Sequence, residues 1–296
     1  MPTGAPTGAP AGATSVLVVG GSGFLGGELI RRAADSGWAT AATYATRPGV
    51  AAGAAATVDW HRLDLRDADE VDTVLAAVQP DVVINTSSGG ADWAVTAEGP
   101  VRLAVAAARH RIRLVHLSSD AVFSGRASPY DESCPLDPVT PYGAAKAAAE
   151  TGILVVHPAA AVVRTSLIIG HGRSEHERLV HDLAAGTRAG ALYTDDIRCP
   201  VHVTDLAEAL LELAASDAAG VHHLAGPDAL SRYELGTLIA RRDGLAAARL
   251  PSALRAHSPL PGALDVRLDS TATLRTLRST LRGAREFLNG PGPSPG

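Results

Sequence analysis

Short apolar runs alternate with amphipathic stretches along most of the chain, from residue 15 to residue 288. The runs that predict strands cover residues 15–20, 39–45, 60–63, 81–87, 113–119, 160–168 and 221–226. Helical periodicity covers residues 24–35, 67–78, 92–110, 141–152, 174–185, 204–215, 231–242 and 270–288. Short apolar strands separated by helices are typical of a parallel sheet covered on both faces. With right-handed crossovers, this pattern predicts an α/β fold with a doubly wound parallel (Rossmann) sheet.

The two ends of the chain differ in composition from the rest. Residues 1–14 form a Pro/Gly/Ala/Thr repeat and residues 290–296 read GPGPSPG, so we expect both to be disordered tails. Between them we expect an NADP-binding Rossmann domain over residues 15–170, to which residues 200–226 return. A smaller C-terminal substrate-binding lobe is expected from the remaining segments, residues 171–199 and 227–289.

Composition and charge narrow the class of protein. The net charge is −5 and the basic residues are scattered, so we expect no nucleic-acid partner. The apolar runs are too short to span a membrane, and we see no signal peptide at the N-terminus. Cys134 and Cys199 are too few for a disulfide framework, so we interpret both as reduced thiols in a cytoplasmic protein. Of the 26 basic residues only Lys146 is a lysine, which singles that position out.

A glycine-rich turn follows the first predicted strand, in the stretch VVGGSGFLGGEL. Gly20, Gly23 and Gly26 fit G-x-x-G-x-x-G where a strand meets a helix. There the tight turn and the free N–H groups of the helix start, at Phe24 and Leu25, suit a pyrophosphate. This context predicts a dinucleotide site.

The end of the second predicted strand bears on the choice of dinucleotide. The stretch TYATRPG has no carboxylate to read a ribose 2′-hydroxyl, and it contains Arg47. Because an arginine can pair with a 2′-phosphate, the sequence favours NADP(H) as the cofactor.

Tyr142 and the sole lysine, Lys146, are four residues apart in PYGAAKAAAE. Thr140 can cap a helix that begins at Pro141, and this spacing then puts both side chains on one face. An ammonium beside the phenol would lower the pKa of Tyr142, so that it can exchange a proton near neutral pH. The ammonium can also bind a cofactor ribose, and the planar fork of arginine does not offer the same compact donor.

GGSGFLG, LSSDAVFSG (117–125) and PYGAAKAAAE together resemble an extended short-chain dehydrogenase/reductase, over roughly residues 15–290. Within that superfamily the chain is most similar to the dTDP-4-dehydrorhamnose reductase family. The resemblance implies a catalytic triad of Ser119, Tyr142 and Lys146, with Ser118 as a structural neighbour. It also implies cofactor contacts from Asp64, Leu65, Thr86, Ser87 and Ser88. The segment after the fourth strand and the C-terminal half depart from the family pattern, so the resemblance supports the cofactor half better than the substrate.

Other polar residues carry weaker signals. Asp120 and Arg198 are expected to contact the substrate, Arg198 through a diphosphate, although a surface ion pair explains Arg198 equally well. His171, His176 and His181 repeat every five residues, which is not the spacing of a helical metal site, so we expect no metal.

The preferred interpretation is an NADPH-dependent reductase of a keto group, most simply on a nucleotide-linked 4-keto-6-deoxysugar. A 4,6-dehydratase is disfavoured because Ala121 follows Asp120, where that relative needs an acid. An epimerase, a tailoring ketoreductase of a non-sugar metabolite and a non-catalytic NADP-binding regulatory subunit stay open, as does assembly into a homodimer.

Overall fold

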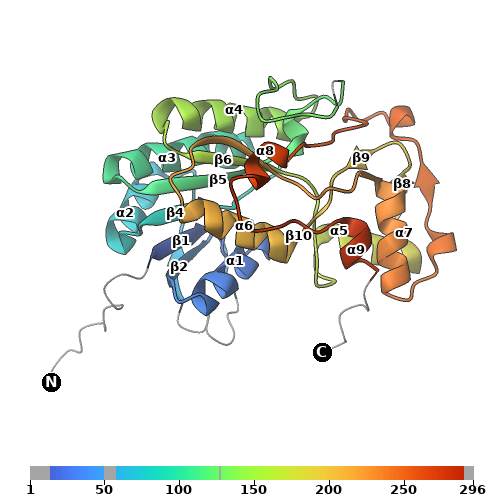
Figure 1. The fold of residues 1–296 in the computed structure, drawn as a ribbon, viewed down its shortest axis with the longest axis horizontal. Coiled ribbons are helices and arrows are strands. Elements are labelled where there is room, and N and C mark those ends of the chain that lie inside the picture. Colours follow the sequence, from blue (N-terminus) through green and yellow to red (C-terminus); the bar gives the residue numbers. More distant parts are fainter. Residues whose placement is uncertain (1–13, 50–57, 127, 290–296) are drawn as a thin grey trace.

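The computed structural model describes residues 14–49, 58–126 and 128–289, and a seven-stranded parallel sheet lies at its centre (Figure 1). The strands run in the order β11-β6-β5-β4-β1-β2-β3. They are β1 (Ser15–Val19), β2 (Ala39–Tyr44), β3 (Asp59–Arg62), β4 (Val82–Asn85), β5 (Arg113–Ser119), β6 (Ala161–Thr165) and β11 (Gly220–Leu224). The predicted doubly wound Rossmann sheet is confirmed, and its strand order reverses between β1 and β4.

Helices cover both faces of the sheet, as the apolar strands require. On one face α1 and α6 pack over the core that includes Val16 and Ile84. On the other face α2, α3 and α4 pack over Leu17 and Val83. Figure 1 shows the two layers, with α1 and α6 on one side of the sheet and α2, α3 and α4 on the other. These helices are α1 (Phe24–Asp35), α2 (Ala68–Val78), α3 (Gly99–His110), α4 (Pro141–Val156) and α6 (Val203–Ala214).

A second, smaller group of elements packs around its own core at the C-terminal ends of the strands. This core joins Val180 and Leu183 of α5 to Leu235 and Ile239 of α7. The elements of this lobe and its connections are β7 (Ile168–Ile169), α5 (Glu175–Ala185), β8 (Leu192–Tyr193), β9 (Ile197–Arg198), β10 (Val201–His202), β12 (Leu230–Ser231), α7 (Arg232–Arg242), the 3₁₀ helices Ala247–Arg249 and Arg255–His257, and β13 (Ser252–Ala253). Within residues 200–226, α6 and β11 lie against the central sheet, β11 pairing with β6. The division into two domains at the stated boundaries stays a prediction.

Two predicted helices differ from the structure. The stretch 92–110 begins as a π-helix, Ala94–Glu98, and continues as α3. Pro100 has no N–H to donate to the carbonyl of Thr96, which disfavours an uninterrupted α-helical ladder there. The stretch 270–288 forms only two short helices, α8 (Thr271–Leu274) and α9 (Ala284–Phe287).

The physical reason for the second difference lies on α6. The backbone N–H groups of Arg278 and Ser279 donate to Glu212, and that of Arg282 donates to Asp205. The chain between α8 and α9 therefore bonds to α6 carboxylates instead of to itself. The predicted disordered tails fall almost wholly on residues outside the described ranges.

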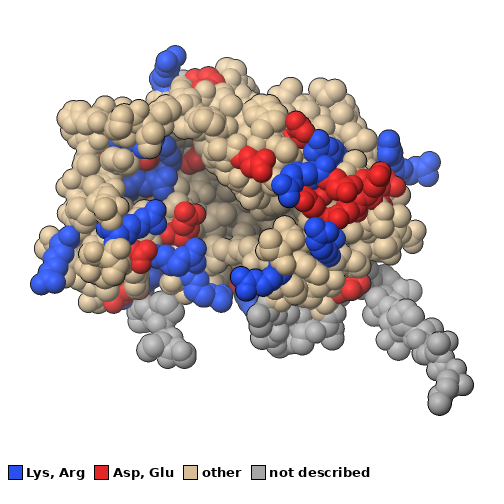
Figure 2. Space-filling model, turned by 180° about the vertical axis from the view of Figure 1, so that it is seen from behind, with Lys and Arg blue, Asp and Glu red and all other residues tan. Residues whose placement is uncertain are grey.

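Figure 2 shows the face of the molecule opposite to that of Figure 1, which is hollowed near its middle. Basic and acidic side chains lie interspersed on both sides of the hollow, so the described residues form no continuous basic patch on this face. No helix within the described ranges is long and apolar enough to cross a membrane.

Candidate active site

The glycine turn connects β1 to α1 at the point where the strand order reverses. Gly20 has a φ of +82°, and a Cβ there would lie 2.9 Å from the backbone nitrogen of Ser87. A Cβ on Gly26 would lie 2.3 Å from the carbonyl oxygen of Gly20. These two positions therefore require glycine so that the turn, α1 and the end of β4 can pack together.

The outer side of the turn is open. A Cβ on Gly23 would meet, among the described residues, only the carbonyl oxygen of Gly20 within 4 Å. Gly23 also caps α1 without a side-chain hydrogen bond, so the helix start presents its N–H groups to the open side. The shape of this cradle suits a pyrophosphate, and dinucleotide binding at the turn stays a prediction.

Tyr142 lies at the start of α4, where Thr140 and Pro141 act as predicted. The Thr140 hydroxyl accepts the N–H of Gly143 at 3.0 Å, and Pro141 is the first helical residue. The phenol of Tyr142 interacts with the side chains of Ser119, at the end of β5, and Ser88, which follows β4. The helix start thus brings Tyr142 to the carboxyl ends of two neighbouring strands.

Lys146 is buried one turn further along α4, with 3% of its surface exposed. Its Nζ donates to the carbonyl oxygen of Leu117 at 2.9 Å. Burial lowers the pKa of Lys146 to about 8, and the carboxylate of Glu150 opposes that shift. The ammonium therefore occupies a tight space beside β5, as the choice of lysine over arginine implied.

The electrostatics of Tyr142 differ from the expectation. Burial, together with the charge of Asp120, raises the pKa of Tyr142, while the Ser119 and Ser88 hydroxyls oppose the rise. The predicted lowering by Lys146 is wrong for this structure, because the Nζ of Lys146 is turned to the Leu117 carbonyl.

The two serines at the end of β5 have different surroundings. Ser118 is buried, and its hydroxyl donates to Glu150, which also binds the guanidinium of Arg164. Ser119 is partly exposed, and its Oγ donates to Asp120 Oδ1 at 3.3 Å. Ser119 therefore faces the open site beside Tyr142, whereas Ser118 is part of the core.

The expected adenosine contacts lie along the ends of β2 and β3. Arg47 follows β2 and is exposed, and no ion pair joins it to another residue that the structure describes. Asp64 follows β3, and Arg66 holds its carboxylate with a shortest distance of 2.6 Å, which lowers the pKa of Asp64 to about 2. Leu65 is buried against Gly99. Because Arg66 occupies the Asp64 carboxylate, adenine would have to share that group.

Thr86, Ser87 and Ser88 follow β4 beside the glycine turn. The Thr86 hydroxyl donates to the carbonyl oxygen of Val19 at 3.1 Å, and Ser87 donates to Asn85. Ser88 is exposed and reaches Tyr142. This stretch therefore runs from the glycine turn to the phenol.

Asp120 and Arg198 meet, with Nε of Arg198 3.7 Å from Oδ2 of Asp120. The guanidinium is buried, and it donates to the carbonyl oxygens of Ile197 and Ala263 at 2.7 and 2.9 Å. Together with the contact of Nε to Asp120, these bonds turn all three guanidinium nitrogens toward protein groups. The expected diphosphate contact of Arg198 therefore does not fit, and the residue is neither a surface ion pair nor a free anion ligand.

A family model described as the RmlD substrate binding domain matches residues 14–282. The chain belongs to this family.

Two relatives with curated names are similar over most of their length. The dTDP-4-dehydrorhamnose reductase of Mycobacterium tuberculosis is 33% identical over 253 residues, which are 83% of this chain and 81% of that protein. A Streptomyces antibioticus protein, named a probable dTDP-4,6-dihydroxy-2-methyloxan-3-one 4-ketoreductase, is 30% identical over 291 residues, which are 90% and 93% of the two chains. The RmlD family thus includes sugar-nucleotide ketoreductases, and the predicted class, an NAD(P)-dependent oxidoreductase of the extended short-chain type, is confirmed.

A solved structure shows that the fold is shared. The Bacillus anthracis dTDP-4-dehydrorhamnose reductase, in complex with NADP, superposes with a TM-score of 0.78 at 19% identity. The match covers 94% of this chain and 98% of that one. At this identity the likeness concerns the fold, and the roles of individual residues in this RmlD-family chain stay predictions.

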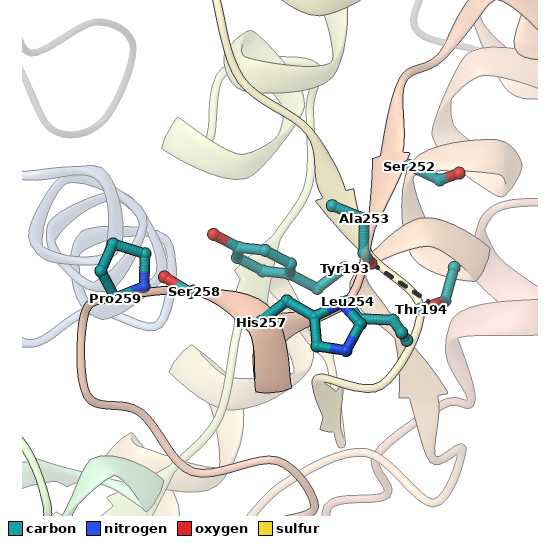
Figure 3. Close-up of a pocket in the computed structure, with 8 residues that line it drawn as sticks. All are labelled: Tyr193, Thr194, Ser252, Ala253, Leu254, His257, Ser258 and Pro259. Carbon is teal, nitrogen blue, oxygen red and sulfur yellow. Dashed lines mark hydrogen bonds between the residues drawn. The ribbon is translucent and has the colours of Figure 1, made fainter.

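The smaller C-terminal lobe of this RmlD-family chain contains a cavity of about 540 Å³ that the sequence motifs did not indicate. It lies between β8, β13 and the 3₁₀ turn after β13, and Figure 3 shows the Tyr193 ring and His257 among the side chains around it. The guanidinium of Arg255 lies 5.3 Å from the centre of the Tyr193 ring. The residues that line it are Tyr193, Thr194, Ser252, Ala253, Leu254, His257, Ser258 and Pro259.

A second feature that sequence reasoning missed lies beneath Lys146. Asn85 and His116 are fully buried neighbours on β4 and β5, and Asn85 Nδ2 lies 3.1 Å from His116 Nδ1. Asn85 Oδ1 accepts two bonds from Ser87, so its amide nitrogen must donate to His116. Burial and the charge of Lys146 keep the pKa of His116 well below its ordinary value. Both residues lie within apolar strands, where no spacing marks them.

Proposed function

We propose that this RmlD-family protein is an NADPH-dependent reductase of a keto group on a nucleotide-linked 4-keto-6-deoxysugar. The observation that carries the proposal is the meeting of Tyr142 with Ser119 and Ser88 at the carboxyl ends of β5 and β4. Ligands of open α/β sheets bind at such strand ends, beside the point where the strand order reverses.

The residues proposed to hold NADPH follow one another along this edge. The backbone of Gly20, Gly23, Phe24, Leu25 and Gly26 suits the pyrophosphate, because the turn is open at Gly23. Arg47 is proposed for the 2′-phosphate, and Lys146 and Tyr142 for the nicotinamide ribose. Asp64 and Leu65 are proposed for adenine, and Thr86, Ser87 and Ser88 for the middle of the cofactor. When bound, NADPH supplies the hydride that reduces the carbonyl carbon.

Tyr142 is proposed as the proton donor. Its raised pKa keeps the phenol protonated at neutral pH, so that it can give its proton to the carbonyl oxygen as charge develops there. The Ser119 hydroxyl, next to the phenol, is proposed to bind the same oxygen and orient it. Lys146 is proposed to hold the ribose, because its Nζ has further N–H groups besides the one bound to Leu117.

The cavity beside Tyr193 is proposed to take the nucleotide part of the substrate. Arg198 is five positions after Tyr193 along the chain, so their Cα atoms lie at most roughly 17 Å apart. Arg198 in turn lies 3.7 Å from Asp120, the neighbour of Ser119. We propose that an elongated ligand reaches from the cavity to the triad. Asp120 is kept as a proposed contact near the sugar, whereas the diphosphate role of Arg198 is not proposed.

The test is a panel of nucleotide-linked 4-ketosugars, with loss of NADPH absorbance as the readout. Tyr142→Phe should slow turnover about 10²–10⁴-fold, since it removes the proton donor and little volume. Lys146→Arg should also abolish turnover in a folded protein, Ser119→Ala should slow it, and Ser118→Ala should matter less. Tyr233→Phe on α7 is the matched control.

Two results would count against the proposal. Full activity in both Tyr142→Phe and Lys146→Arg would rule out this mechanism. Tight NADPH binding without oxidation by any ketosugar would favour the regulatory NADP-binding alternative.

A further inference from the structure

Asp120 is a buried carboxylate directly beside the proposed triad, with 5% of its surface exposed. Its Oδ2 accepts the hydroxyl of Ser166 at 2.6 Å, and its Oδ1 accepts that of Ser119 at 3.3 Å. A buried carboxylate is costly unless a cation compensates its charge. The residue that compensates Asp120 therefore influences the charge at the site.

Arg198 supplies this cation from the lobe. Among the residues described, it is the one that forms an ion pair with Asp120, between Nε and Oδ2 at 3.7 Å. Its other nitrogens donate to three carbonyl oxygens, those of Ile197, Ala263 and Leu264. These bonds hold the guanidinium in place, so its positive charge stays beside Asp120 when a ligand binds.

The charges around this pair are balanced. Arg198 also meets Asp196 at 2.9 Å, and Asp196 meets Arg232 of α7 at 3.5 Å. Two buried carboxylates thus face two guanidinium groups. Removing Arg198 would leave the carboxylates in excess next to the site.

We propose, resting on the function proposed above, that Arg198 is a positioning residue of the reaction: it neutralises Asp120 from the lobe and thereby sets the charge beside the phenol of Tyr142. A reductase needs this phenol to release its proton to the substrate, and an uncompensated anion next to it opposes that release. The lobe and the Rossmann sheet are thereby coupled through one ion pair.

The other groups that face Asp120 and Tyr142 do not replace Arg198. The guanidinium of Arg232 and the thiol of Cys199 lie near enough to interact with the charge of Asp120. The ammonium of Lys146, on α4, is turned to the Leu117 carbonyl. Among the described residues, the hydroxyls of Ser119 and Ser88 lower the pKa of Tyr142, while burial and the charge of Asp120 raise it.

The test measures the ionisation of Tyr142 without substrate. For each variant, the tyrosinate absorbance is recorded as pH rises to about 10. The absorbance of the same variant carrying Tyr142→Phe is then subtracted, which leaves the contribution of Tyr142. Arg198→Met removes the charge and keeps an unbranched side chain, and it should reduce the ionised fraction of Tyr142 about tenfold, a shift of about one pH unit. Asp120→Asn should increase it, and the double variant should return close to the wild type.

Controls separate this role from a merely structural one. Arg232→Met removes a neighbouring, partly buried cation that forms no ion pair with Asp120 among the described residues, so its effect should be smaller. The alkaline limb of the rate profile should move up in pH in Arg198→Met, because the phenol stays protonated longer. Wild-type protein that oxidises no NADPH, with the ionisation shifts intact, would overturn the proposed function but not the role of Arg198.

An unchanged ionisation of Tyr142 in folded Arg198→Met would overturn the inference, as would shifts of the same sign in Arg198→Met and Asp120→Asn. If Arg198→Met does not fold, Asp120→Asn in the otherwise native chain decides, since failure to increase the ionised fraction contradicts the proposal.

Discussion

Gly143 packs against Ala121 so closely that a Cβ on the glycine would lie 2.0 Å from the carbonyl oxygen of Ala121. Gly143 follows Tyr142 on α4, and Ala121 lies two residues after Ser119. The close approach of these two backbones therefore sets how near the phenol comes to the serine. Position 143 in this chain therefore requires glycine for the packing of α4 against the segment after β5.

We expect Gly143→Ala to displace α4 from the end of β5. The clash is with backbone, so the cost should be about 1–3 kcal/mol of stability. A shift of about 1 Å between Tyr142 and Ser119 should slow turnover about 100-fold. Thermal unfolding and NADPH oxidation measure the two effects.

Gly27→Ala is the matched control, because Gly27 also lies in a helix and a Cβ there meets nothing within 4 Å. It should stabilise the protein by roughly 0.5–1 kcal/mol. Equal melting temperatures for Gly143→Ala and the wild type would contradict the packing argument.

Lys146 should make stability rise with pH in the alkaline range. Its pKa is about 8 in the fold, below the ordinary value of 10.5, so the unfolded chain binds the proton more tightly. Burying the charged form therefore destabilises the protein below pH 8, and this penalty disappears as pH rises from about 8 towards 10.5. The free energy of unfolding of the wild type, relative to Lys146→Met, should increase by about 1.4 kcal/mol per pH unit there.

Denaturant unfolding of both proteins at several alkaline pH values measures this difference, and other titrating groups cancel because they are common to both. A difference that is flat over this range would mean that Lys146 is not buried as a cation.

Arg47 is expected to select the phosphorylated cofactor. Arg47→Ala should weaken NADPH binding by about 1.5–3 kcal/mol, the value of a charge-assisted hydrogen bond, and leave NADH binding nearly unchanged. Fluorescence titration with both cofactors measures the ratio. Arg109→Ala, another exposed arginine at the end of α3, is the control for general charge effects. Wild-type protein that binds NADH as tightly as NADPH would show the assignment to be wrong.

The parts of the fold that the sequence predicted correctly depend on residues close together in the chain. The cap at Thr140, the proline at 141 and the glycine turn after β1 act within a few residues, so their sequence patterns sufficed. Short apolar strands with right-handed crossovers predicted the doubly wound parallel sheet.

The errors concern contacts between distant segments. No pattern near Arg198 reveals that carbonyls of residues 263 and 264 bind it, or that Asp120 lies beside it. The spacing of Tyr142 and Lys146 predicted their common helix, but the pKa of Tyr142 depends on burial by segments outside that helix. Ser119 and Ser88 meet the phenol only because two strands end side by side.

The segment after α8 also takes its conformation from a contact with a distant residue, Glu212 of α6. Its sequence has helical periodicity, but Glu212 of α6 accepts the N–H groups of Arg278 and Ser279 at 2.7 and 2.8 Å, and the Ser279 hydroxyl at 2.7 Å. These bonds lower the pKa of Glu212 to about 2. The stabilisation is therefore present above the ordinary pKa of about 4.5 and is lost as pH falls towards 2.

Glu212→Gln should cost about 1–3 kcal/mol at neutral pH, and its difference from the wild type should shrink in acid. Glu208→Gln, one turn earlier on α6, keeps these bonds and is the control. A Glu212→Gln protein as stable as Glu208→Gln at neutral pH would mean that the carboxylate does not hold this segment against α6.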